Sequence, residues 1–243
     1  MIGSIQANLN NVSKLSSVSF RSNAQNPQGV SSSSPDSFVS EKQKIKEILD
    51  KGIYNFKTEK GAEFSGNIKD FIESHIIEPK KMVKYEGLYH GTLRESGESI
   101  VENGFDAGKI TRTKCGPGVS FTSEEYLAHE LGGGYILRCD FEGNRVRTKY
   151  GYYQAIQNNQ QVASDICNVL GIENNPTSFD EAMKIREITD KHVYDYTRNV
   201  LINELGIDAA NDMGDYPSIP GCFVVFNTDC VSNVRSESAG FSS

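Results

Sequence analysis

The chain has 243 residues and a formal net charge of −7 at pH 7, with 25 lysine and arginine residues against 32 acidic ones. That length suffices for one domain with a substantial core, while the acidic balance argues against a protein that binds nucleic-acid phosphates. No stretch is apolar for long enough to predict a membrane-spanning helix, and the N-terminus lacks the basic-then-apolar layout of a secretory signal. We therefore expect no membrane association, and either a cytoplasmic protein or an effector secreted without a classical signal peptide.

The five cysteines are widely spaced and form no C-x-x-C pair. Zinc sites built from short motifs normally contain such pairs, so no metal site is expected. An odd number of cysteines favours reduced thiols. The five are Cys115, Cys139, Cys167, Cys222 and Cys230.

Residues 1–36 are rich in serine, asparagine and glutamine and have no helical or strand period. This composition predicts a disordered leader, which is either an export signal for a bacterial secretion system or a plain flexible terminus. We expect one ordered domain over residues 37–235, followed by a flexible tail over 236–243. Within the domain, a helical and hairpin part (37–82) precedes a core part (83–235).

The N-terminal part of the domain combines helical and strand patterns. Residues 39–49 and 67–76 each have the apolar spacing of an amphipathic helix. Between them, residues 53–58 and 62–64 alternate around a turn at 59–61, which predicts a β-hairpin.

The core part begins with a short strand over residues 83–89 that ends in the polar tip His90-Gly91. The pattern is helical from 95 to 103, and Gly104 stands at the C-terminal stop. A glycine lets the backbone approach a ligand closely, and an imidazole donates and accepts hydrogen bonds in fixed directions. His90 is therefore a candidate binding residue, the alternative being a half-buried structural histidine at a strand end.

The middle of the core part alternates strands and helices. A strand is predicted over 119–123 and a helix over 124–131, with Ser123 as its N-cap. A second strand is predicted over 135–141, closed by a turn at 142–144.

The remainder of the core part is mainly helical. Helical patterns are predicted over 150–169 and over 179–205, the second capped by Thr177 or Ser178. The last predicted strands are at 207–210 and 222–226.

Six motifs occur in a fixed order along this part of the chain: YHGT, ENGF, GPGVSFTSEEYLAHEL, YILRCDF, GIDAAND and GCFVVFN. Together they resemble the ADP-ribosyltransferase superfamily, in the branch of diphtheria toxin and the poly(ADP-ribose) polymerases. The resemblance implies an α+β fold, with two packed, mainly antiparallel small sheets around an NAD cleft and flanking helices. It also implies mono-ADP-ribosyl transfer from NAD to an acceptor such as a protein, in the setting of a bacterial effector or toxin.

The resemblance gives roles to the residues of the YHGT motif. His90 would hydrogen-bond a ribose hydroxyl of the adenosine half of NAD, and Gly91 would pair its backbone with the nicotinamide amide. Thr92, which completes the motif, would join them in binding NAD.

The other motifs depart from the family at the stacking and catalytic positions. Ser120 stands where the family has a ring-stacking tyrosine, and Cys222 stands where it has the catalytic glutamate. By resemblance, Ser120 and Cys222 join His90 as the catalytic set. Phe121 lies beside Ser120, but strand alternation is expected to send its side chain to the other face. Tyr126, in the following helix, and Tyr135 are the further aromatic candidates for the nicotinamide ring.

These departures leave two main hypotheses open. In the first, the protein is an active transferase, and Asp212 or Asp215 supplies the missing carboxylate. In the second, it is an inactive member that binds NAD, ADP-ribose or a protein partner, and a plain structural domain is a third possibility. The cholera-toxin-like branch is matched only loosely by SFTS, and an RNA 2′-phosphotransferase would need basic residues that this acidic chain does not gather.

Overall fold

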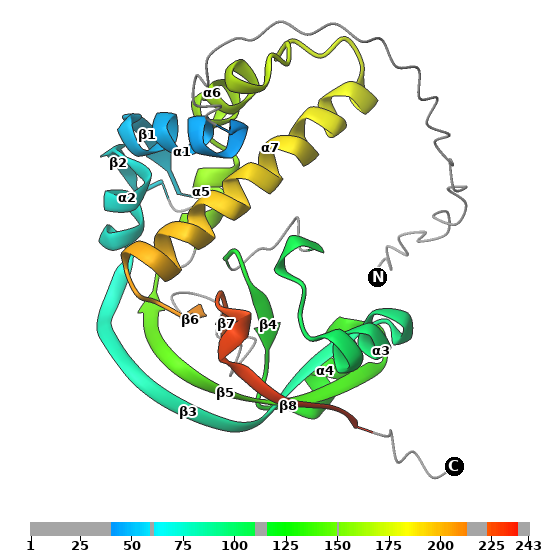
Figure 1. Ribbon diagram of the computed structural model, residues 1–243. Helices are drawn as coiled ribbons and strands as arrows, with labels where there is room; N and C mark the ends of the chain where they lie inside the picture. Colours follow the sequence, from blue (N-terminus) through cyan, green and yellow to red (C-terminus); the bar gives the residue numbers. More distant parts are fainter. Residues whose placement is uncertain (1–39, 59–60, 110–115, 150, 213–222, 238–243) are drawn as a thin grey trace, which may run out of the picture. The chain divides into compact units, whose positions relative to one another are not determined.

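The structure is a computed structural model that describes residues 40–58, 61–109, 116–149, 151–212 and 223–237 (Figure 1). The chain divides into two units, Met1–Phe38 and Val39–Ser243. The leader expected over residues 1–36 lies outside the described residues, and all that follows concerns the second unit.

The described residues form seven α-helices and three short helical turns. The α-helices are α1 (Glu41–Lys51), α2 (Ile68–Ser74), α3 (Arg94–Asn103), α4 (Glu125–Gly132), α5 (Tyr152–Gln157), α6 (Gln160–Leu170) and α7 (Phe179–Asn199). The single turns are the 3-10 turns η1 (Ala107–Lys109) and η3 (Thr228–Cys230), and the π-helical turn η2 (Val200–Glu204) that continues α7.

The strands form two unequal sheets. They are β1 (Tyr54–Lys57), β2 (Glu63–Gly66), β3 (Ile76–Thr92), β4 (Val119–Phe121), β5 (Tyr135–Thr148), β6 (Ala209–Asp212), β7 (Phe223–Val225) and β8 (Val231–Glu237). β1 and β2 make a hairpin, and the larger sheet has the order β3-β5-β6-β7-β4 with β8 added to β5. Every pair is antiparallel except β5–β6. The predicted mixture of helices with two mainly antiparallel sheets is confirmed at this level.

The larger sheet closes on itself, which the sequence did not predict. Tyr89 of β3 and Thr122, just after β4, exchange two backbone hydrogen bonds of 2.8 and 2.9 Å. The first and last strands of the sheet order are thereby joined. Figure 1 shows β3 and β5 as the long curved pair that runs along this sheet.

Two hydrophobic clusters hold the unit together. One joins the hairpin, α1, α2, α5, α6 and α7 around fully buried side chains such as Phe56, Ile72 and Leu201, and reaches the sheet at Val146 and Val224. The other lies against the strands of the closed sheet. Its buried members are Leu88, Val119, Phe121, Leu137, Cys139, Phe141, Ala209 and Val225.

The strand that leads to His90 is much longer than predicted, because β3 starts at Ile76 and the preceding helix ends at Ser74. Its pairing with β5 shifts register at three places: between Ile76 and Glu78, around Pro79, and around Gly87. Proline has no N–H for the ladder. Gly87 has φ of +74° and donates its N–H to Asp140 Oδ1 at 2.8 Å. These irregularities hide the alternation that would mark a long strand.

The turn predicted at residues 142–144 is wrong, because β5 runs straight through it. The backbone N–H of Asn144 donates to Asp208 Oδ2 at 2.7 Å, and β5 then pairs in parallel with β6. The bond to Asp208 therefore supports the strand where a turn was expected.

Several smaller boundaries also differ from prediction. Ser123 is not the N-cap of α4, because Glu124 takes that position. The N–H of Glu124 donates to the hydroxyl of Thr122 at 3.1 Å. The helix predicted over 150–169 is divided at Asn158–Asn159 into α5 and α6. At the C-terminus, β8 extends to Glu237, inside the segment predicted as a tail.

Candidate functional site

The candidate site is built around His90, at the end of β3 beside the point where the sheet closes. The Nδ1 atom of His90 lies 2.9 Å from the backbone oxygen of Ser120 on β4. A carbonyl oxygen only accepts hydrogen bonds, so Nδ1 carries the proton and Nε2 is left as an acceptor. Burial lowers the pKa of His90 below its usual 6.5, and the hydrogen bond to Ser120 opposes this only in part. The imidazole is therefore neutral at pH 7.

A cavity of about 400 Å³ opens beside this histidine. Its walls come from the end of β3, from α3, from the segment that follows α3, and from β4. The lining residues are His90, Thr92, Ser96, Ser99, Ile100, Gly104, Phe105, Asp106, Lys109, Gly118, Val119 and Ser120. The lining residues that the structure describes provide hydroxyl groups, the carboxylate of Asp106, the ammonium group of Lys109 and the ring of Phe105, which suits a polar ligand with a planar part.

Phe105 is the aromatic residue of this cavity. Gly104 ends α3 with φ of +79°, which glycine adopts readily, and Phe105 follows it directly. The Phe105 ring meets His90 edge-on, with 5.4 Å between ring centroids. Phe121, predicted to contact NAD, is only 2 % exposed and lies in the core. Its ring packs against the His90 ring, with 5.6 Å between the ring centroids. Strand alternation sends Phe121 and Ser120 to opposite faces of β4, since Ser120 is exposed and Phe121 is buried.

Gly91 serves helix packing rather than ligand approach. A Cβ atom at this position would overlap the backbone oxygen of Ala128 and the backbone of Gly132, both in α4. A Cβ at Gly132 would in turn overlap the backbone of Gly91. The two glycines let α4 lie directly on β3, and Gly91 does not line the cavity.

The other predicted site residues fall in different places. Thr92 and Ser120 line the cavity. Tyr126 is 58 % exposed on α4 and does not line it. Cys222 and Asp215 lie outside the described residues, and of Asp212 only the backbone, at the end of β6, is described.

Sequence reasoning missed the segment that follows α3, above all Asp106. Its Oδ1 accepts the N–H of Gly108 at 2.9 Å, and its backbone oxygen accepts the N–H of Lys109 at 3.1 Å. These bonds form a tight turn that brings both charged residues to the cavity wall. The only available signal was position, since GFDAGK directly follows the glycine stop of the helix next to the YHGT motif.

Comparison with models of known protein families finds no match, and comparison with curated proteins finds none either. Within the described part of the chain, no three His, Cys, Asp or Glu side chains gather in a way that could hold a metal ion. No helix among those residues is both long and apolar enough to cross a membrane.

Proposed function

We propose that the protein binds NAD in the cavity beside His90 and transfers its ADP-ribose group to an acceptor, such as a protein side chain. One observation carries the proposal: a neutral histidine, whose Nε2 has no hydrogen-bond partner among the described residues, and the carboxylate of Asp106 line the same cavity. The motif resemblance around YHGT and GVSFTS supports the choice of NAD, and the hydroxyl-rich lining is compatible with a ribose-containing ligand.

In this reaction the bond between C1′ of the ribose and the nicotinamide nitrogen breaks, and its electron pair stays with nicotinamide. The acceptor then forms the new bond to C1′ and releases a proton. Positive charge develops on the ribose, so a nearby carboxylate would stabilise the transition state more than the ground state. Asp106 would supply that charge, in place of the glutamate that the family has at the Cys222 position.

The remaining lining groups fit the rest of such a ligand. Nε2 of His90 would accept a hydrogen bond from a ribose hydroxyl, and the Phe105 ring offers an apolar surface for a planar base. Lys109, at the end of η1, would balance the charge of the diphosphate. The neutral state of His90 matters here, because a protonated ring could no longer accept.

A second candidate function is NAD or ADP-ribose binding without turnover. It is favoured because none of the aromatic candidates for stacking on the nicotinamide ring lines the cavity: Phe121 is buried in the core, and Tyr126 lies elsewhere on α4. In that case the cavity would hold the ligand, and Asp106 would only orient it.

The deciding experiment follows nicotinamide release from NAD by the purified protein and by two pairs of variants. His90→Ala should lower kcat/KM on the order of 100-fold, as expected when a hydrogen bond that holds NAD in its reactive orientation is removed. Asp106→Asn should lower kcat by a similar factor and leave NAD affinity nearly unchanged, because the carboxylate acts mainly in the transition state. His129→Ala on α4 and Glu102→Gln on α3 are the matched controls, since neither residue lines the cavity.

The outcomes separate the two candidate functions. NAD binding that is lost in His90→Ala, without any nicotinamide release by the wild type, would favour the binding module. Release that both His90→Ala and Asp106→Asn leave intact would rule out this cavity as the site.

A further inference from the structure

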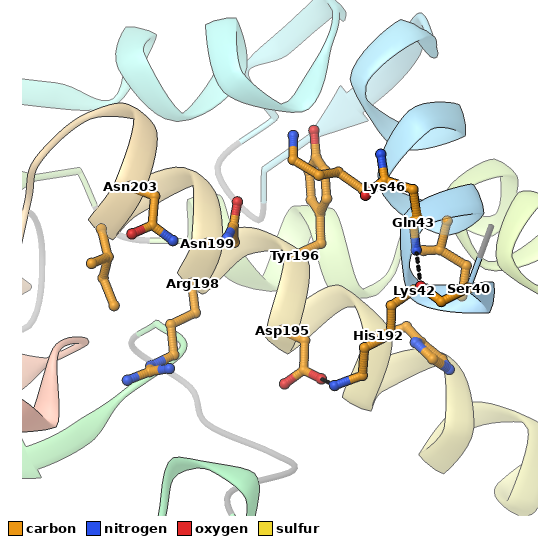
Figure 2. Close-up of a pocket in the computed structure, with 12 residues that line it drawn as sticks. Ser40, Lys42, Gln43, Lys46, His192, Asp195, Tyr196, Arg198, Asn199 and Asn203 are labelled. Carbon is orange, nitrogen blue, oxygen red and sulfur yellow. Dashed lines mark hydrogen bonds and ion pairs between the residues drawn. The ribbon is translucent and has the colours of Figure 1, made fainter. Parts of the chain in front are cut away.

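A second cavity of about 400 Å³ lies between α1 and the end of α7, and it shares no lining residue with the cavity at His90 (Figure 2). Among the described residues, its polar groups do not converge on one point. Lys42 and Asp195 pair with each other at 3.7 Å. Figure 2 shows Arg198 directed away from the asparagine amides of the same wall, and its Nε–H donates to the backbone oxygen of Phe226 at 2.6 Å. Side chains from different elements do converge at the wall of the His90 cavity.

Three aromatic rings contact one another at that wall. They belong to His90 at the end of β3, Phe105 just after α3 and Phe121 on β4. The centroid distances are 5.4 Å for His90 and Phe105, 5.6 Å for His90 and Phe121, and 5.4 Å for Phe105 and Phe121. Each ring therefore packs against both of the others, at distances where aromatic pairs attract.

Of these three rings, only that of Phe121 is buried in the core. It is 2 % exposed and belongs to the hydrophobic cluster of the closed sheet, whereas His90 and Phe105 are half-buried. Its strand is also held in place, because Thr122 exchanges two backbone hydrogen bonds with Tyr89. Close-packed interiors leave a buried ring little room to move. Phe121 is thus the fixed member against which the other two rings rest.

On one side, Phe121 helps to hold the imidazole of His90. Two successive residues of β4 contact that imidazole: the backbone oxygen of Ser120 lies 2.9 Å from Nδ1, and the Phe121 ring packs against the imidazole ring. The Ser120 contact uses the backbone, so of these two contacts only that of Phe121 depends on a side chain of β4. The packing also keeps water from one side of the imidazole, and burial lowers the pKa of His90.

The charged groups near His90 come from the segment after α3 and from β5. Asp106 and Lys109 line the same cavity. Arg138 on β5 lies over the Tyr89 ring, at 5.8 Å from its centroid. The helix α4 meets this end of β3 through glycine and alanine backbone, which carries no charge.

On its other side, Phe121 reaches the Asp106 carboxylate through Phe105. The Phe105 ring packs against the hydrophobic cluster of the closed sheet and so attaches the segment after α3 to it. Asp106 follows directly, and its Oδ1 accepts the N–H of Gly108 at 2.9 Å in a tight turn. A displacement of the Phe105 ring would therefore displace the turn and the carboxylate with it.

We propose that Phe121 is a positioning residue, whose ring holds His90 and the Asp106 turn at a fixed separation across the cavity. This inference rests on the proposed function, in which both groups act on one bound NAD. Phe121 does not line the cavity, so it acts through its two neighbours rather than on the ligand. A misplacement of about 1 Å can cost about a hundredfold in rate, which is why a buried ring matters to the reaction.

The test compares two variants of the purified full chain, Phe121→Leu and Phe141→Leu. Phe141 is 1 % exposed, belongs to the same hydrophobic cluster and does not line the cavity, so it is the matched control. Both substitutions remove a buried ring and should lower the unfolding temperature similarly. Only Phe121→Leu should lower kcat/KM for nicotinamide release from NAD, on the order of tenfold, with a lower kcat as well as a higher KM.

A second measurement needs no NAD. An NMR titration of the histidine side chains gives the pKa of His90, assigned by the signal that is absent from His90→Ala. In Phe121→Leu water reaches the imidazole more easily, so the pKa of His90 should rise toward its usual 6.5. Phe141→Leu should leave the pKa of His90 as it is in the wild type.

Phe105→Leu tests the link to Asp106 and leaves the core intact, because Phe105 is only half-buried. If Phe121 acts on Asp106 through Phe105, the two substitutions share one effect. The double variant should then lower kcat by less than the product of the two single factors. Factors that simply multiply would contradict this link.

The outcomes for Phe121 and for the proposed function are separable. NAD kinetics and a His90 pKa in Phe121→Leu that match those of Phe141→Leu would overturn the positioning role. If the wild type releases no nicotinamide, the proposed function fails, and the pKa comparison still decides whether the Phe121 ring holds His90. A rise in Phe121→Leu alone supports that contact, and an unchanged value refutes it.

Discussion

Gly91 has no room for a methyl group, because the backbone of α4 occupies the space where its Cβ would be. Relief would require β3 and α4 to move apart, since a backbone oxygen cannot rotate away as a flexible side chain can. The neighbouring His90 would move with the strand. A single glycine therefore links the packing of the helix to the position of the candidate binding residue.

We predict that Gly91→Ala lowers the free energy of unfolding by about 3 kcal/mol, the upper part of the range for overpacked sites. Urea denaturation would measure the change. Gly108→Ala is the control, because a Cβ there meets only the carboxylate end of Asp106 at 3.1 Å. An effect of Gly91→Ala no larger than that of Gly108→Ala would contradict the packing explanation.

A residue of the cavity could be predicted from the sequence where both its side-chain chemistry and its place at the end of a strand are distinctive. His90 was a candidate because it follows a strand and precedes a glycine, and the structure places it in the cavity wall. The packing role of Gly91 could not be predicted. A glycine allows another group to approach the backbone closely, and the sequence does not show whether that group is a ligand or a helix. Asp106 was missed for a related reason: an acid in a loop is usually solvated, and only the fold brings it to the cavity.

At the scale of elements, helix starts offer a direct comparison between a predicted cap that forms and one that does not. At the start of α7, the Ser178 hydroxyl accepts the N–H of Glu181 at 3.2 Å. The Glu181 carboxylate in turn accepts the N–H of Thr177 at 2.7 Å, which completes a reciprocal cap. At α4, by contrast, Ser123 makes no such bond among the described residues.

Ser178→Ala should therefore destabilise the protein by about 1 kcal/mol, the usual loss for an N-cap hydroxyl. Ser123→Ala should leave stability nearly unchanged, although both serines look equally good in the sequence. Thermal unfolding of the two variants beside wild type would test the pair. Equal losses would show that our account of the α4 start is wrong.

Elements with regular patterns were predicted well, and those with interrupted patterns were not. The hairpin, α1, α3 and α7 follow their apolar periods and stop signals closely. β3 and β5 were predicted too short, because Pro79, Gly87 and Gly143 are typical of turns when only neighbouring residues are considered. Their place inside strands depends on partners such as Asp140 and Asp208, which lie far away in the sequence.

At the scale of the whole molecule, one buried histidine, His75, and two half-buried ones, His90 and His192, make stability depend on pH. Burial lowers the pKa of His75, His90 and His192 below 6.5. The unfolded chain then binds more protons than the folded one as the pH falls below about 6.5. Stability from these groups is present above that value and is lost on acidification toward the lower folded-state pKa.

Buried thiols and phenols have the opposite effect at high pH. Burial raises the pKa of Cys139 to about 12, that of Cys230 to about 11 and that of Tyr194 to about 12. The unfolded chain loses these protons first as the pH rises above roughly 9, so the folded state loses stability there.

We therefore expect the unfolding free energy to be highest between about pH 7 and pH 9, with a decline on both sides. Urea denaturation at constant ionic strength from pH 5 to pH 10.5 would measure it. Replacing His75 by glutamine should flatten the acidic side of the curve. Stability that increases from pH 6.5 to pH 5 would refute the assignment of these histidines.

The position of β4 in the closed sheet has a consequence for the order in which the strands pair during folding. β4 carries Ser120, and its longest pairing among the described residues is with β7, near the end of the chain, through Val119–Val225 and its neighbours. During synthesis, β3 and β5 emerge and can pair well before β7 exists, whereas β4 has to wait for it. The contact between His90 and Ser120 would then be among the last to form, and a chain cut short before residue 223 would contain every residue of the His90 cavity without being able to assemble it.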